Sequence, residues 1–294
     1  RRFFPEGLAE MAQLETSGIH GNRPQSDFRV LLALHGLADP HASLSHALAL
    51  TVAAGGGIEI VDVGNGRGEH LRVRDVLQHW GMLPEGSERK DVGRLGIRVK
   101  KIVRSGNEGR EVGKRLERSD HDLLVIGTGR NEGALAFLRE TLTVYLVRRY
   151  RKTTLYLPEG AAGFVDRDTG AVSLRRILFA VAEHPTAAGA CMFLEQLASL
   201  VPDTAVEVVG VHVGTSFPSL NWDLPRGWSW RREVIAPAGR PVWRHVTEQA
   251  EQFGADLVVT ATNGRDTLMQ RIVGSVTEQV LNAVPCPLLA VAVG

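Results

Sequence analysis

The stretch "DLLVIGTGRNEGALAFLRETLTVYLVRRYRKTTLYLP" (122–158) aligns without gaps with "DLVVTATNGRDTLMQRIVGSVTEQVLNAVPCPLLAVA" (256–292), at a constant offset of 134 residues. The identical positions include the pairs Asp122/Asp256, Leu123/Leu257, Val125/Val259, Thr128/Thr262, Thr143/Thr277 and Leu155/Leu289. Upstream, "FRVLLALHG" from Phe28 has the pattern of "RRILFAVAE" from Arg175, although the second half is shorter before Asp256. This internal repeat indicates one structural unit that was duplicated and then diverged.

Each half alternates short runs of Val, Ile and Leu with helical stretches, which is typical of strands buried on both faces of a parallel sheet. In the first half we expect strands at 29–34, 58–63, 97–103, 122–127 and 153–157, and helices at 41–53, 73–80, 107–118 and 139–149. In the second half we expect strands at 175–181, 206–213, 231–235, 256–261 and 287–292, and helices at 186–199, 240–252 and 275–283. The sequence therefore predicts an α/β fold, built twice.

Two stretches between these elements have the composition of loops. "GTSFPSLNWDLPRGWSW" (214–230) carries prolines, glycines and three tryptophans, so we expect a loop or insertion in place of a helix. Trp222, Trp228 and Trp230 would either stack on a base or a partner or, as is more common, cover a sheet edge or a domain contact. The polar, glycine-containing "EGAAGFVDRDTGAVS" (159–173) is typical of a linker.

These boundaries divide the chain into four parts. They are an N-terminal arm (1–24), a first domain (25–160), a linker (161–173) and a second domain (174–294). The arm begins with two arginines and two phenylalanines, and three alternatives stay open for it: packing on its own chain, exchange with a partner chain, or weak membrane-surface attachment.

The composition excludes several classes of protein. Of the 294 residues, 44% are hydrophobic and 23% are charged, and the net charge is +1, which argues against a broad nucleic-acid or lipid surface. Cys191 and Cys286 lie far apart outside any CxxC, so we expect buried thiols and neither a disulfide framework nor a zinc site. No signal-peptide pattern and no apolar run of ~18 residues are present, so we expect a cytoplasmic protein without a membrane partner.

The stretch "ATNGRDTLMQRIVGS" (261–275) combines the features of an anion site. It follows the predicted strand "ADLVV" and places Gly264 in a loop and Gly274 and Ser275 at the start of a helix. Glycine allows close backbone approach, and the free N–H groups of a helix N-terminus attract a phosphate. On spacing alone, Ser275 as a simple helix cap is the more common alternative.

These residues resemble the universal stress protein family, whose pattern is G-x2-G-x9-G-[ST]. In this chain the pattern reads Ala261-x2-Gly264-x9-Gly274-Ser275. "VWRHVTEQAEQFGADLVVTATNGR" before the pattern and "LNAVPCPLLAVAV" after it are also similar to the family. The resemblance is strong over 237–294 and looser elsewhere, and it suggests a tandem universal stress protein.

The resemblance implies a fold and a ligand. The fold is two flavodoxin-like (adenine nucleotide alpha hydrolase-like) domains, each a five-stranded parallel sheet of order 3-2-1-4-5. In the family, some members bind ATP or another adenine nucleotide, and paired domains commonly associate through their last strands. Here "TTLYLP" (153–158) and "CPLLAVAVG" (286–294) would meet and give the chain the architecture of a dimer. Whether two chains pair again as a homodimer stays open.

The nucleotide-site residues implied for the second half are Val213, Ala261, Thr262, Gly264, Arg265, Gly274, Ser275, Val276 and Thr277. Ala261 departs from the family's glycine but remains small. Ala182 stands where the family has an aspartate that contacts the adenosine end of the ligand, with Glu183 beside it. An alanine cannot accept a hydrogen bond, so affinity or base selectivity should suffer unless Glu183 or a loop group substitutes.

The equivalent site of the first half departs further from the pattern. His35 stands in place of the aspartate, Gly127 ends the fourth strand, and Arg130 replaces a loop glycine. Glu140 and Thr141 occupy the positions of Gly274 and Ser275, and a carboxylate at the helix start would repel a phosphate. We expect a degenerate site kept for structure, with an Arg130–Glu140 pair as the minority alternative.

Other candidate sites are weaker. The spacing of His35, His41 and His46 matches no common metal-ligand set, and a solvated or capping role is expected instead. No nucleophile elbow, zinc-protease or P-loop motif occurs, so no catalytic residue and no metal are expected. Three functions stay open: a non-enzymatic stress-response protein that binds an adenine nucleotide, an interaction scaffold with unknown protein partners and both sites lost, and a weak ATPase or nucleotide hydrolase.

Overall fold

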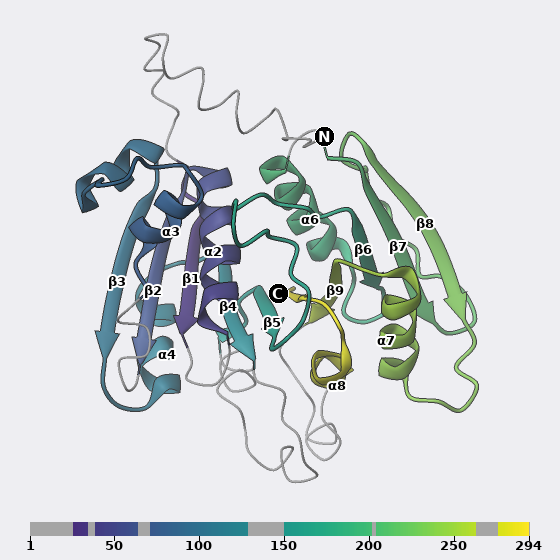
Figure 1. Cartoon of the computed structure of the whole chain (residues 1–294). Coiled ribbons are helices and arrows are strands. Elements are labelled where there is room, and N and C mark those ends of the chain that lie inside the picture. Colours follow the sequence, from purple (N-terminus) through teal and green to yellow (C-terminus); the bar gives the residue numbers. More distant parts are fainter. Residues whose placement is uncertain are drawn as a thin grey trace.

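The computed structural model describes residues 26–34, 39–63, 71–128, 150–201, 204–262 and 276–293. The strands of these residues form one ten-stranded sheet (Figure 1). The first half contributes β1 (Arg29–Leu34), β2 (Gly57–Val63), β3 (Arg98–Arg104), β4 (Leu123–Thr128) and β5 (Thr154–Pro158). The second half contributes β6 (Arg176–Ala180), β7 (Val206–Val213), β8 (Trp228–Ile235), β9 (Leu257–Thr262) and β10 (Leu288–Ala292). The predicted strands are confirmed to within one residue at either end, except that β8 begins three residues early.

The order of the strands repeats in the two halves. It is β3-β2-β1-β4-β5-β10-β9-β6-β7-β8, so each half follows the order 3-2-1-4-5. Neighbouring strands within a half are parallel, whereas β5 and β10 pair antiparallel with Leu155 opposite Leu289. The predicted meeting of the two last strands is confirmed, and it makes one continuous sheet instead of two separate five-stranded sheets.

Helices cover both faces of this sheet (Figure 1). The described helices are α2 (Pro40–Ala54), α3 (Val73–His79), α4 (Glu108–Arg118), α6 (Ala188–Leu200), α7 (Val242–Phe253) and α8 (Val276–Ala283), with a 3-10 helix η2 (Arg89–Leu95) that was not predicted. Leu48 of α2 and Leu194 of α6 belong to one buried cluster on one face, and Leu116 of α4 and Val246 of α7 belong to a cluster on the other. Because the first cluster includes helices of both halves, the two halves share a hydrophobic core. The helix predicted at 139–149 lies outside the described residues.

Helix α2 shows how local sequence sets an element's ends. Asp39 caps its N-terminus by accepting hydrogen bonds from the backbone N–H groups of His41 (2.9 Å) and Ala42 (3.2 Å). Pro40 occupies the first turn, where its missing N–H is not needed. Gly55 ends the helix in the left-handed conformation, with φ of 61°. With these three residues, α2 begins and ends within one residue of the predicted range.

The tryptophan-rich stretch is a loop that covers one sheet face beside the edge strand β8. Trp222 of the loop and Trp230 of β8 meet edge to face, with ring centroids 5.3 Å apart, and both approach Phe179 of β6. A Cβ at Gly210 of β7 would overlap the Trp230 indole, so only glycine allows this close packing. Of the two roles considered for the tryptophans, the structure supports covering the sheet. Trp228 and Trp230 belong to β8, which explains the strand's early start.

The predicted linker is a folded segment and not a flexible connection. Val165 and Val172 form an antiparallel bridge, and Phe164 (2% exposed) and Leu174 (0%) lie in the core shared by both halves. A few apolar side chains anchor the segment in the core, while its polar turn remains in solvent. Residues 164–174 are called the linker hairpin below.

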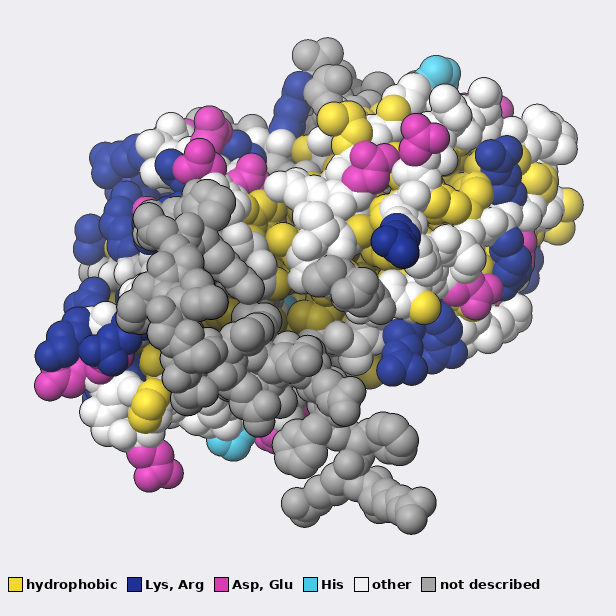
Figure 2. Space-filling view, turned by 90° about the horizontal axis from the view of Figure 1, so that it is seen from above, with side chains coloured by type: hydrophobic (Ala, Val, Ile, Leu, Met, Phe, Trp, Pro, Cys, Tyr) yellow, Lys and Arg dark blue, Asp and Glu magenta, His cyan; other side chains and the backbone are white. Residues whose placement is uncertain are grey.

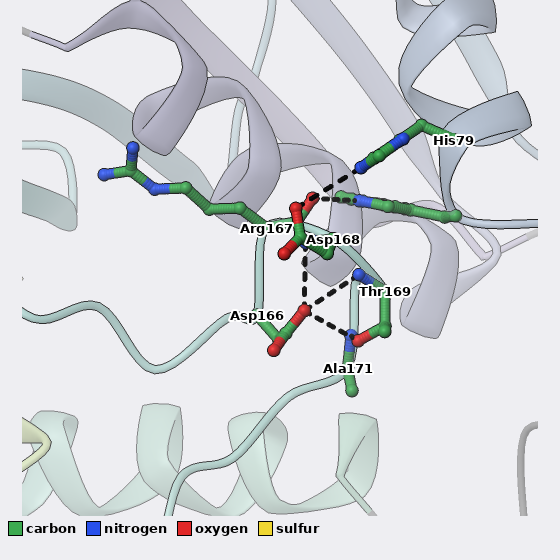
Figure 3. A network of polar contacts seen from close by, with 7 residues as sticks. His79, Asp166, Arg167, Asp168, Thr169 and Ala171 are labelled. Carbon is green, nitrogen blue, oxygen red and sulfur yellow. Dashed lines mark hydrogen bonds and ion pairs between the residues drawn. The ribbon is translucent and has the colours of Figure 1, made fainter. Parts of the chain in front are cut away.

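The turn of the linker hairpin is held by its own side chains and by α3 (Figure 3). Asp166 accepts hydrogen bonds from the N–H groups of Asp168 and Thr169 and from the Thr169 hydroxyl, at 2.8–2.9 Å. Asp168 faces His79 of α3 at 3.3 Å, and the indole N–H of Trp80 donates to the Arg167 carbonyl oxygen at 2.8 Å. These contacts fix the hairpin on the first half of the chain.

His46 of α2 is a buried contact to this hairpin, so the expectation of a solvated or capping histidine was wrong. Its side chain bonds the Ala42 carbonyl oxygen through Nδ1 at 2.8 Å and accepts the Phe164 N–H at Nε2 at 3.1 Å. Because a carbonyl oxygen only accepts, Nδ1 carries the proton and the ring is neutral. His46 is 1% exposed, and this burial lowers its pKa from 6.5 to about 4.

We expect the stability of the protein to fall between pH 7 and pH 5 because of His46. Since its folded pKa lies below its unfolded pKa, the unfolded chain binds the proton more readily over this range, and acid favours unfolding. The loss should be roughly 2 kcal/mol. Urea denaturation at pH 7 and pH 5 of the native protein and of His46→Gln measures it, since only the native protein should show this extra loss. Equal losses in both proteins would contradict the assignment.

Candidate functional site

The carboxyl ends of β6, β7 and β9 lie at one edge of the sheet. These strands are parallel and adjacent, with Ala180 of β6 opposite Val211 of β7 and Thr260 of β9. Two residues further along each strand direction are Ala182, where the resemblance places a missing aspartate, and Val213 and Thr262, which it assigns to the nucleotide site. The structure therefore brings these three predicted positions to the same edge, which is where open parallel sheets bind ligands.

The side chains at this edge are more exposed than those before them. Val208, Val209 and Val259 are at most 1% exposed, whereas Val213, Ala261 and Thr262 are partly exposed and Ala182 is exposed. Val276 (44% exposed) and the partly exposed Thr277 begin α8. The ends of β6, β7 and β9 thus present partly exposed or exposed side chains at this edge. Gly264, Arg265, Gly274 and Ser275 lie outside the described residues.

The position of the missing aspartate is exposed at this edge. Ala182 follows β6 by two residues and is followed by the exposed Glu183 and His184. The absence of a carboxylate at Ala182 is a fact of the sequence, and Glu183 is an acceptor next to it. The structure assigns no hydrogen bond to Glu183 among the described residues.

His212 is a residue of this edge that sequence analysis missed. It is 7% exposed, and its Nδ1 donates to the Val181 carbonyl oxygen at 2.8 Å, which ties the end of β7 to the end of β6. Its ring also approaches Phe217 of the tryptophan-rich loop, with centroids 6.3 Å apart. His212 therefore links the ends of β6 and β7 to the tryptophan-rich loop, directly before Val213. Its place as the penultimate residue of β7 was a weak signal, because single histidines are common in buried positions.

The corresponding edge of the first half contains a buried carboxylate. Asp62 of β2 is 4% exposed and lies opposite Leu34, the last residue of β1. Its Oδ2 has no hydrogen-bond partner among the described residues. Gly127 is buried in β4 opposite Leu157, while His35, Arg130, Glu140 and Thr141 lie outside the described residues.

Other reactive groups are not arranged as a site. Over the described residues, no three His, Cys, Asp or Glu side chains come together as metal ligands. Cys191 and Cys286 are buried free thiols, as predicted, and burial raises the pKa of each to about 12. Thiols with such a pKa are poor nucleophiles at neutral pH.

Part of the second half matches the sequence model of a known protein family. Residues 231–292, which include β9, α8, β10 and the predicted phosphate loop, match the model of the universal stress protein family. The similarity to this family at the level of sequence therefore lies in residues 231–292 of the second half. This family indicates a role in the stress response. No curated protein sequence matches the chain.

Solved structures of universal stress proteins are similar over nearly the whole chain. A universal stress protein from Archaeoglobus fulgidus is 16% identical with a TM-score of 0.60, covering 92% of this chain and 97% of its own. A putative universal stress protein from Pseudomonas aeruginosa is 13% identical with a TM-score of 0.56, covering 91% and 94%. At such identities the similarity shows the fold, so the first half shares the architecture of the universal stress protein domain.

No helix in the described part of the chain has both the length and the apolar character that crossing a membrane requires.

Proposed function

We propose that the protein is a stress-response regulator that binds an adenine nucleotide, without converting it, at the carboxyl edge of its second half. The observation that carries this proposal is the convergence of Val213, Ala261 and Thr262 at one partly exposed edge. The family pattern Ala261-x2-Gly264-x9-Gly274-Ser275 begins at this edge and lies within the matched residues 231–292. The residues at this edge are small, and the pattern ends directly before α8, whose N-terminal N–H groups are suitable donors for a phosphate.

One observation favours a second candidate function, an interaction scaffold without nucleotide. The Ala182 side chain offers no hydrogen-bond acceptor to an adenosine. The two candidates differ in one property, which is whether the purified protein holds a nucleotide.

The test is to purify the full chain without added nucleotide, denature it, and identify released small molecules by mass spectrometry, with ATP titration calorimetry alongside. We expect a stoichiometric adenine nucleotide or measurable ATP binding. Gly274→Glu should weaken binding roughly tenfold or more, because it places a like charge beside the phosphate.

Met192→Glu is the matched control, since Met192 is 70% exposed on α6 and the change adds the same charge. It should bind as the native protein does. Absence of release and of binding heat at millimolar ATP would instead support the scaffold. Steady hydrolysis of the bound ATP would refute the non-enzymatic part of the proposal.

A further inference from the structure

The segment from η2 to α4 is rich in Lys and Arg. Residues 89–118 contain eleven Lys or Arg and four Asp or Glu, although the whole chain has a net charge of +1. Figure 2 shows Lys and Arg side chains gathered on the side of the molecule where Figure 1 places β3. This concentration of charge lies on an edge strand, since β3 stands at the end of the strand order.

Among the described residues, only β2 pairs with the backbone of β3, so one side of β3 has no paired strand there. The Arg98 N–H donates to the Gly56 carbonyl oxygen at 3.0 Å, so Arg98 and every second residue after it turn their backbone groups toward β2. Val99 and Val103 therefore turn their N–H groups outward, away from the sheet. The register with β2 is continuous from 98 to 104, so no bulge interrupts this alternation. Outward N–H groups on an edge are a template for an added strand.

The cations beside this edge are only partly neutralised. Lys100 pairs with Glu59 at 3.0 Å, and Lys114 pairs with Glu111. The exposed Arg104 and Arg110 form no ion pair with a described carboxylate, although Lys114 and both arginines hold the pKa of the Glu111 carboxyl below its usual value. Arg104 instead donates to the outward carbonyl oxygen of Val103 at 3.0 Å. A carboxylate of a binding partner near the end of β3 would therefore meet two arginines that have no ion pair with a described carboxylate.

The opposite edge of the sheet differs. Arg231 of β8 pairs with Glu207 and Glu233, and Arg232 lies over the Phe217 ring and donates to Leu220. These two arginines contact carboxylates or an aromatic ring of their own chain, whereas Arg104 and Arg110 form no ion pair with a described carboxylate. Two copies of the basic β3 edge would repel each other, so a second copy is a poor occupant.

We propose that the outer edge of β3 binds an extended acidic segment of another protein, which adds as a further strand to the sheet. Backbone hydrogen bonds to Val99 and Val103 provide the pairing, and Asp or Glu at alternate positions of the segment meets Lys100 and Arg104. The exposed Val103 side chain (46%) offers an apolar contact on the other face. Residues 89–118 contain no aromatic side chain on which a nucleic-acid base would stack, which favours a protein segment over single-stranded nucleic acid.

The test uses the full-length protein and a fluorescent peptide of alternating valine and glutamate, with binding followed by anisotropy. The native protein should bind the peptide, and Arg104→Glu combined with Arg110→Glu should weaken binding roughly tenfold or more. Val103→Pro should weaken it to a similar extent, because proline removes an outward N–H and leaves the bonds to β2 in place. The same peptide with N-methyl groups on alternate residues keeps its charge but cannot pair as a strand. Its binding to the native protein should be as weak as that of the unmodified peptide to Val103→Pro.

A single-stranded oligonucleotide of equal charge separates the alternatives. If Val103→Pro and N-methylation leave peptide binding unchanged while the charge reversal weakens peptide and oligonucleotide equally, the surface is a general polyanion site and the proposal is wrong. Absence of peptide binding by the native protein also overturns it. Neither outcome affects the nucleotide proposal, which concerns the second half of the chain.

Discussion

Replacing Ala182 with aspartate should tighten the binding of an adenine nucleotide by roughly 10- to 100-fold, since a hydrogen bond to a charged group contributes about 1.5–3 kcal/mol. Ala182 is exposed at the same edge as Val213 and Thr262, so the new carboxylate would reach the edge without displacing core side chains. By resemblance to the universal stress protein family, this is where an aspartate meets the adenosine end of the ligand.

Titration calorimetry with ATP measures the change, and Ala182→Leu is the matched control because it adds volume without an acceptor. The leucine variant should bind no more tightly than the native protein. If the aspartate and leucine variants have equal affinities, Ala182 does not face the ligand, and the assignment of this edge is wrong. A gain with adenosine as well as with ATP would place the effect at the nucleoside end.

Replacing Phe164 with alanine should lower the free energy of unfolding by about 3–5 kcal/mol, the range for removing a large buried aromatic side chain. Phe164 is 2% exposed and belongs to the core shared by both halves. It also meets the His46 ring edge to face, with centroids 4.8 Å apart. One side chain of the linker hairpin thus stabilises the contact between both halves.

Urea denaturation measures this loss, with Asp168→Ala as the control from the same hairpin. Asp168 pairs with His79, but their side chains are 87% and 63% exposed, so its removal should cost less than about 1 kcal/mol. Phe164→Leu keeps most of the side-chain volume, so it can be measured if Phe164→Ala does not fold. Similar losses for Phe164→Ala and Asp168→Ala would show that the hairpin is not part of the core.

Most of the strands were predictable because their signals are local. The buried runs of Val, Ile and Leu located the strands, and the cap, proline and glycine of α2 located its ends. The repeat at 122–158 and 256–292 predicted two equivalent halves, and the repeated strand order agrees with it. Resemblance to the family supplied the strand order itself, which periodicity alone does not contain.

The candidate site was predictable only in part. Val213, Ala261 and Thr262 do meet at one edge, because the carboxyl ends of adjacent parallel strands must. His212 and Asp62 were missed, since their importance depends on a neighbouring strand that is distant in the sequence. The nucleotide itself stays a prediction.

By itself the sequence determined the α/β class and the duplication, because each is a property of residue types and their spacing, and its resemblance to the universal stress protein family added the phosphate-loop pattern and the missing aspartate at Ala182. Only the tertiary structure decided that β5 and β10 join the halves into one sheet and that His46 is neutral and buried. It also decided that the polar linker is a folded hairpin and that, within the described part of the chain, no strand pairs with the outer side of β3 and no carboxylate pairs with Arg104 or Arg110. These features arise from contacts between residues far apart in the chain, and burial or pairing of this kind leaves no local pattern.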